Sequence, residues 1–232
     1  MHGRHIGGWI TALLAIASLA AGAQDAPPDT RVLDAASAAD GAGVEALLAQ
    51  GVDANVSQAD GATALHWAAH FDATSMATAL IRSGAAVDPA NDFGVTPLWL
   101  ACLNGSADMV EVLLTAGADA SHTLPSGETV LMTTSRTGSA EAVSLLVAHG
   151  ANMNAQEQSR GQTALMWAVA QQHPDVVKTL VEFGADVHVR SDARPRRIHT
   201  RTAGFNPTGV IDTVQGGNTA MLFAARQGNL DA

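Results

Sequence analysis

The sequence contains, from Gly94 to Ser121, the stretch GVTPLWLACLNGSADMVEVLLTAGADAS, which is the clearest copy of a unit that recurs along the chain. Its Thr96 has an earlier counterpart at Thr63 and later ones at Thr129 and Thr163, at a nearly constant interval. Its Gly-Ala pair recurs before and after it at the same interval. A period of about 33 residues indicates a repeat architecture, in which each copy is one small structural unit.

Each unit is predicted to form two helices. Thr96 can cap the first helix because its hydroxyl accepts a hydrogen bond from a free backbone amide, and Pro97 suits the first helical position, where no N–H is needed. Gly105 ends this helix. The second helix is predicted over about 106–116, and Gly117 offers a left-handed cap at its end.

One helix pair cannot bury both of its apolar faces, so its stability depends on stacking against neighbouring copies. The sequence therefore predicts an all-α solenoid of stacked helix-turn-helix units with projecting turns. We expect Leu98 and Leu113 to be buried between units. Trp67, Trp99 and Trp167 recur along the first helices, in register with one another, and are predicted to form a packing ladder.

The units resemble ankyrin repeats in motif, period and helix pattern. The motifs that carry the resemblance are GATALHWAA at 61–69, GVTPL at 94–98 and Gly-Ala-Asp at 184–186. The residues that replace the usual His of the motif are Trp99, Met132 and Met166. The resemblance places repeats one to five at 29–189 and the start of a truncated sixth repeat at 217–232. It implies a non-catalytic scaffold that binds a protein partner through its concave face and turn tips.

Residues 1–23 are predicted to be a secretory signal peptide of the bacterial type, followed by a short linker at 24–28. Arg4 gives a cationic start, Trp9 to Ala21 is almost uninterruptedly apolar, and Ala21-Gly22-Ala23 has the form of a cleavage site. This apolar run is shorter than the roughly 20 residues that span a membrane. We therefore expect a periplasmic or secreted protein without a membrane span after signal removal. A retained N-terminal anchor is the alternative.

The charge of the chain limits the classes of partner. Acidic residues number 22 and basic ones 12, which gives a formal net charge of −10 and argues against nucleic acid as a partner. The single cysteine, Cys102, stands where other copies have Ala69 or Ser135, so we expect a small buried side chain instead of a reactive thiol.

The regular spacing of the repeats is interrupted after Val189. The next Gly-x-Thr motif is at 217–219, so the interval from Thr163 to Thr219 is well over one period. The intervening segment, 190–216, contains five arginines together with Pro and Gly and has little apolar periodicity. These features predict a basic loop insertion. It folds back on the acidic repeats, contacts an anionic partner or serves as a disordered linker.

No constellation of residues indicates catalysis, and we expect no enzyme, cofactor or metal site. His66 and His70 are four positions apart, but Trp67 stands where a zinc-protease helix needs Glu. The resemblance assigns His66 a structural role, in which its ring bonds loop backbone.

Binding candidates are the residues that differ between copies at the end of the first helix, together with turn-tip and insert residues. They are His70, Phe71, Phe93, Leu103, Asn104, Arg136, Thr137, Gln171, Arg194, Arg196 and Arg197. Two alternatives stay open: the chain is the recognition or regulatory portion of a larger enzyme or redox protein, or it is an inhibitor or immunity-type binder. The partner's identity does not follow from these residues.

Overall fold

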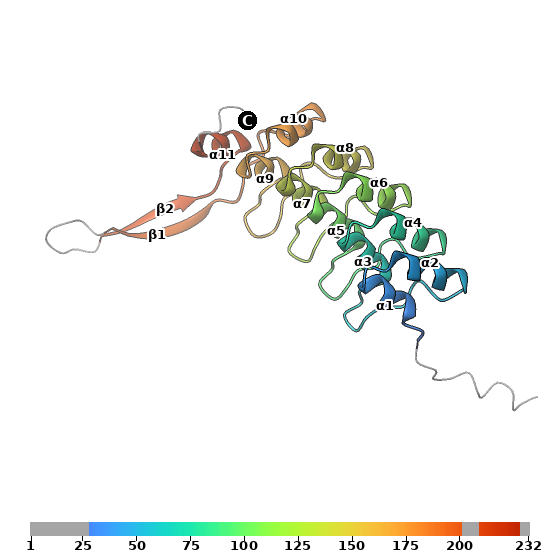
Figure 1. Cartoon of the computed structure of the whole chain (residues 1–232). Helices are drawn as coiled ribbons and strands as arrows, with labels where there is room; N and C mark the ends of the chain where they lie inside the picture. The colour runs from blue at the N-terminus through green and yellow to red at the C-terminus, as the bar shows by residue number, and fades with distance from the viewer. Residues whose placement is uncertain (1–27, 201–208, 228–232) are drawn as a thin grey trace, which may run out of the picture.

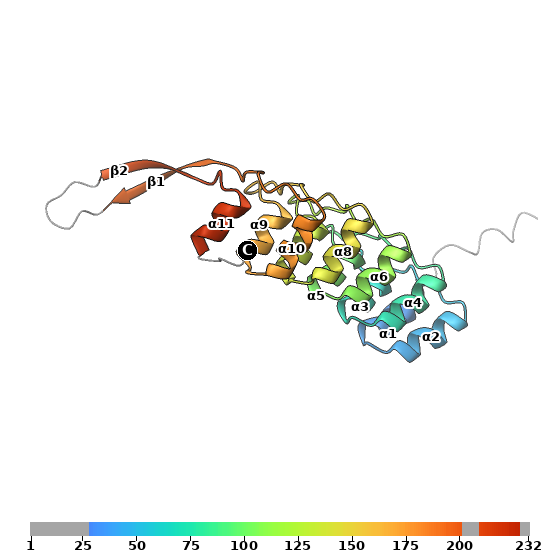
Figure 2. The same cartoon turned by 90° about the horizontal axis from the view of Figure 1, so that it is seen from above.

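The chain forms a curved stack of helix pairs, as the computed structural model of residues 28–200 and 209–227 shows (Figures 1 and 2). One layer holds the inner helices, which are α1 (Arg31–Ser37), α3 (Ala64–His70), α5 (Pro97–Asn104), α7 (Val130–Thr137) and α9 (Ala164–Ala170). The other layer holds the outer helices, which are α2 (Gly41–Ala49), α4 (Thr74–Arg82), α6 (Ala107–Thr115), α8 (Ala140–Ala148) and α10 (Pro174–Glu182). The predicted all-α solenoid of helix-turn-helix units is confirmed. The predicted signal peptide and most of the predicted linker lie outside the described residues.

The helices begin where the capping residues are. Thr96 Oγ1 accepts a hydrogen bond from the backbone N–H of Trp99 at 3.2 Å, and Pro97 occupies the first helical position of α5. Thr129 caps α7 in the same way. Gly117 follows α6 with a φ of +97°, and a Cβ there would meet no atom within 4 Å, so the left-handed backbone alone accounts for glycine at this position.

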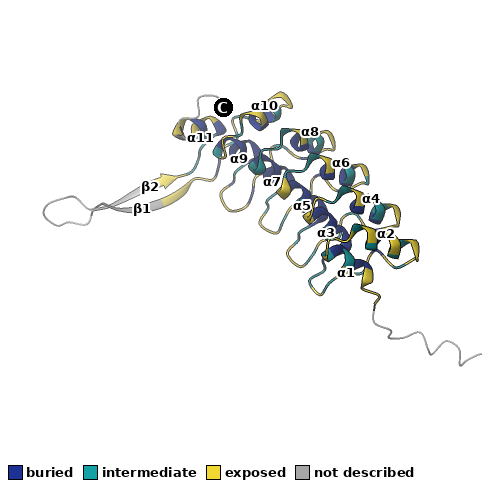
Figure 3. Cartoon of the chain, in the orientation of Figure 1, coloured by how far each residue is buried: buried dark blue, intermediate teal, exposed yellow. Residues whose placement is uncertain are grey.

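One continuous core runs between the two layers (Figure 3). Leu98 and Leu113 are fully buried, as predicted, and small residues such as Ala101 let adjacent inner helices approach closely. Cys102 is buried and unpaired. No described helix is of a length and apolarity sufficient to cross a bilayer.

The tryptophans pack against this core as expected, but their predicted common register is wrong. All three are half-buried, and their indole Nε1 atoms are buried. Trp67 and Trp167 are the fourth residue after their capping Thr, whereas Trp99 is the third after Thr96 and takes the position of His66. The spacing between Trp67 and Trp99 is one position shorter than the spacing between their capping threonines, which accounts for the shift.

The insertion differs from the predicted loop. Its residues form a two-stranded antiparallel ribbon, β1 (Arg194–Thr200) and β2 (Gly209–Gln215), in which Arg194 pairs with Gln215 and Thr200 with Gly209. The β-branched residues of β2 favour this extended backbone, and the strand ladder pairs backbone groups without needing a buried face. The ribbon extends from the stack beside the shorter turns of the preceding repeats (Figure 1).

A final inner helix, α11 (Ala220–Gln227), follows the ribbon and packs against α9. It is the first helix of the predicted sixth repeat. No outer helix accompanies it within the described part of the chain.

Candidate protein-interaction surface

The candidate residues lie mainly along one surface, here called the inner face, which is made of the solvent side of the inner helices and the tips of the turns before them. The turns project from the starts of the inner helices, and each inner helix then runs across the face to its last residues (Figure 1). This is the concave surface that the sequence predicted as the binding face.

The end of α3 carries an aromatic cluster. The ring of Phe71 stacks on the indole of Trp67, with centroids 5.8 Å apart and planes 23° from parallel. The imidazole of His70 meets the Phe71 ring edge-on at 5.0 Å. Phe71 nevertheless remains 42% exposed. Its position is thus fixed by neighbouring rings while one face of it is open to a partner.

The third repeat adds two more exposed apolar side chains. Leu103, near the end of α5, is 37% exposed, and Phe93, at the turn tip, is 71% exposed. The turn that carries Phe93 is ordered, because Asn91 Oδ1 accepts hydrogen bonds from the backbone N–H groups of Phe93 and Val95 at 3.0 and 2.9 Å. Phe93 is therefore presented to solvent on a defined backbone.

Asn104 and Thr137, equivalent residues of successive repeats, bond within the stack. Asn104 Nδ2 donates to the carbonyls of Ala69 and His70, each at 3.0 Å. Thr137 Oγ1 lies within hydrogen-bond distance of two carbonyls, that of Cys102 at 3.2 Å and that of Thr134 in its own helix at 3.0 Å. Each side chain thus adds a contact to backbone carbonyls at the end of the preceding inner helix. Gln171 is exposed at the corresponding end of α9.

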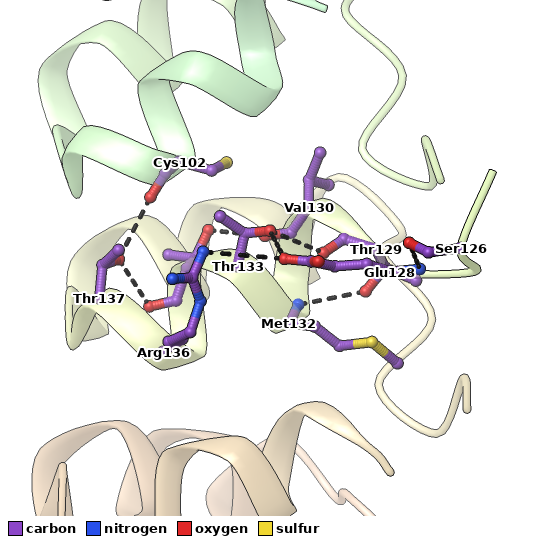
Figure 4. A network of polar contacts seen from close by, with 10 residues as sticks. Cys102, Ser126, Glu128, Thr129, Val130, Met132, Thr133, Arg136 and Thr137 are labelled. Carbon is purple, nitrogen blue, oxygen red and sulfur yellow. Dashed lines mark hydrogen bonds and ion pairs between the residues drawn. The ribbon is translucent and has the colours of Figure 1, made fainter. Parts of the chain in front are cut away.

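Arg136 lies half-buried on the inner face of the fourth repeat (Figure 4). Its Nη2 is 3.8 Å from Glu128 Oε1, which also accepts a hydrogen bond from Thr133 Oγ1 at 2.8 Å. Its guanidinium carbon is 5.8 Å from the centre of the Trp167 ring. The guanidinium is held from two sides, and its exposed part can still meet an anionic group.

Three histidines link neighbouring repeats. His66 Nδ1 accepts from the N–H of Thr63 at 3.1 Å, so its Nε2 carries the hydrogen and donates to the carbonyl of Val95 at 3.0 Å. Burial lowers the pKa of His66, although the bond to Val95 opposes this. The structural role implied for His66 is confirmed.

The other two histidines also contact a backbone carbonyl of a neighbouring repeat through Nε2. His173 Nε2 lies 3.0 Å from the carbonyl of Arg136, and His122 Nε2 lies 2.8 Å from that of Gly94. His122 was not identified from the sequence, since its carbonyl partner belongs to the preceding repeat. Across the described ranges, no group of three or more His, Cys, Asp or Glu is placed to hold a metal ion.

Glu157 is a structural residue that the sequence did not indicate. This carboxylate is buried in the turn before α9 and accepts hydrogen bonds from the backbone N–H groups of Arg160 and Gln162 at 2.8 and 3.1 Å. Burial alone would raise the pKa of Glu157, but these bonds and those from Ser159 outweigh it and lower the pKa. The fixed turn leaves Arg160 exposed.

The arginines of the insertion lie beyond the fifth repeat. Arg194 is exposed at the base of the ribbon, with its Nη2 3.6 Å from Asp192 Oδ2. The backbones of Arg196 and Arg197 pair with Thr213 and Asp212 in the ladder. The other candidates are on the helical repeats, so the two groups form separate parts of the surface (Figure 1).

Cys102 takes no part in this surface. Burial raises the pKa of its thiol to about 12, so the nucleophilic thiolate does not form near neutral pH. The predicted buried, unreactive cysteine is confirmed.

Comparison with known families agrees with this geometry. The sequence matches the family described as ankyrin repeats (3 copies) over residues 33–123 and 109–191, which together span more than half of the chain. The chain therefore belongs to the ankyrin repeat family. Ankyrin repeats are generally protein–protein interaction modules and are typically non-catalytic. Among curated proteins, none matches this chain.

Proposed function

We propose that this chain is a non-catalytic scaffold of an exported protein and that it binds a protein partner on its inner face. The observation that carries the proposal is the display of Phe71, Phe93 and Leu103 on two adjacent repeats of that face. Exposed aromatic side chains held on a rigid backbone supply contact area with little loss of conformational freedom on binding. Arg136 of the next repeat adds a cationic group to the same face.

The apolar and the cationic candidate residues lie on different repeats, so they would contact different parts of the partner. The apolar side chains lie on the second and third repeats, whereas Arg136 and the insertion arginines lie on the fourth repeat and beyond the fifth. A partner segment with apolar residues followed by acidic residues would complement both parts. The sequence of residues 1–23 supports export.

Affinity capture from a periplasmic extract tests the proposal. The bait is the purified mature chain, compared with a Phe71→Ala/Leu103→Ala variant and with a Phe183→Ala variant that alters the end of outer helix α10. The proposal expects one protein to be captured by the wild type and the Phe183 variant and lost from the inner-face variant. Capture that is the same with all three baits contradicts it.

A further inference from the structure

A polar cavity of about 340 Å³ lies where the turn of the fifth repeat, the base of the ribbon and α11 meet. Arg160 comes from the turn, Arg194 from the start of β1 and Arg226 from the end of α11. Asp192 and Phe223 also line the cavity. The cavity thus gathers side chains that are far apart in the sequence.

The walls of the cavity are fixed by backbone hydrogen bonds. The N–H of Asp192 donates to the carbonyl of Arg160 at 2.8 Å, which ties the ribbon to the turn. The N–H of Ser191 donates to the carbonyl of Asn218 at 3.0 Å, which ties the two ends of the ribbon together. A Cβ on Gly216 would overlap the carbonyl oxygen of Asp192, so only glycine permits this approach. The cavity is therefore preformed.

Positive charge prevails in the cavity, although the whole chain carries a formal net charge of −10. Three arginines and one aspartate line it, and Asp192 is engaged by Arg194 at 3.6 Å. Arg160 and Arg226 form no ion pair with any carboxylate in the described part of the chain. Guanidinium groups in such a site favour carboxylate or phosphate, whose oxygens accept two parallel hydrogen bonds.

A second arginine-lined cavity has the opposite character. Arg82, between the outer helices, shares its cavity with three acidic side chains, Glu45, Asp108 and Glu111. An anion would be repelled there. The contrast shows that an exposed arginine alone does not define an anion site, whereas the cavity at the ribbon base combines an excess of guanidinium groups with few opposing charges.

We propose that the cavity at the base of the ribbon binds a small molecule bearing a carboxylate or phosphate group. Arg160 and Arg226 contact the oxyanion, and the half-buried ring of Phe223 lines the side against which an apolar part of the ligand packs. This site is separate from the inner-face residues of the second and third repeats, and it does not depend on the proposed protein partner.

Isothermal titration of the mature chain with inorganic phosphate, and separately with benzoate, tests the site at constant pH and ionic strength. We expect the wild type to bind at least one probe, and the probe that binds assigns the oxyanion class. In the Arg160→Gln/Arg226→Gln variant the dissociation constant should rise at least tenfold. The Arg82→Gln variant, which loses the same kind of group from the acidic cavity, should bind like the wild type.

Circular dichroism of the unliganded variants verifies that they are folded. If the double variant is not folded, Arg160→Gln alone is used, because this side chain is exposed on a turn. This single variant is expected to lose affinity several-fold. Where benzoate binds, Phe223→Ala should weaken it. Failure of both probes to bind the wild type, or equal binding by the wild type and the arginine variant, overturns the proposal. Benzoate binding that Phe223→Ala leaves unchanged overturns the apolar contact.

Discussion

Leu114 and Val181 occupy the same position in the outer helices α6 and α10, yet Leu114 is 3% exposed and Val181 is 46% exposed. The difference follows from the stack, since α8 packs against α6 while no outer helix follows α10 among the described residues. The inner layer shows the same effect. Met221 of α11 is 74% exposed, whereas Leu98, its counterpart in α5, is fully buried.

Stability should therefore differ between these equivalent positions. Leu98→Ala should lower the free energy of unfolding by about 2–5 kcal/mol, because it removes methyl groups from a closely packed core. Met221→Ala should change it by less than about 0.5 kcal/mol, the usual size for a surface substitution. Denaturant titration of both variants measures the two losses. Equal losses would show that the exposed end of the stack is covered in solution.

Much of the repeat fold could be predicted because its signals are local. Thr96, Pro97 and Gly117 mark helix boundaries through the chemistry of a few bonds, and the structure places the boundaries there. The ribbon escaped prediction because arginine and proline, which are not typical strand residues, dominate its first strand. The segment also has little apolar periodicity, which is the signal that predicts a strand.

The contacts of the candidate surface were harder to predict. Asn104 and Thr137 vary between copies as surface residues do, but their hydrogen bonds reach carbonyls of the preceding repeat, which no local pattern reveals. Arg136 depends in the same way on Trp167, a residue of the next repeat. Pairing across repeats is a property of the stack, and only the three-dimensional arrangement shows it.

His66 should make stability depend on pH. Because burial lowers its pKa in the folded state, the neutral ring is favoured by folding, and its contribution is fully present above the ordinary pKa of 6.5. The contribution is lost as the pH falls from about 6.5 through the lowered pKa. His66→Met places the residue found at Met132 and Met166 of later repeats. It should reduce the dependence of the unfolding free energy on pH in this range. Unfolding free energies at pH 7.5 and 5.0 provide the test, and an unchanged slope would contradict the assignment.

The base of the ribbon should be intolerant of a side chain at Gly216. Its φ is +104° and a Cβ would collide with the backbone of Asp192, so Gly216→Ala should open the local hydrogen bonds. Gly184→Ala is the matched control, since its φ is +93° but a Cβ would meet no atom within 4 Å. Left-handed backbone alone costs about 1–2 kcal/mol. Hydrogen exchange should show faster exchange at Ser191 and Asn218 only in the Gly216 variant, and protected amides there would refute the assigned clash.

The proposed export predicts which residue is the first of the mature protein. Cleavage after Ala21-Gly22-Ala23 should give a chain that begins near Gln24. N-terminal sequencing of protein recovered from the producing cells determines this residue directly. A membrane-bound chain that still begins at Met1 would favour the retained anchor over a signal peptide.

The most direct test of the proposed function is the dissociation constant of the captured partner for two matched variants. Phe71 and Phe183 are 42% and 47% exposed, but Phe71 is on the inner face and Phe183 follows outer helix α10. Phe71→Ala should raise the dissociation constant about tenfold or more, as truncation of an aromatic hot spot does. Phe183→Ala should change it less than about threefold, within the range of a peripheral substitution. An unchanged constant for Phe71→Ala together with a loss for Phe183→Ala would contradict binding on the inner face.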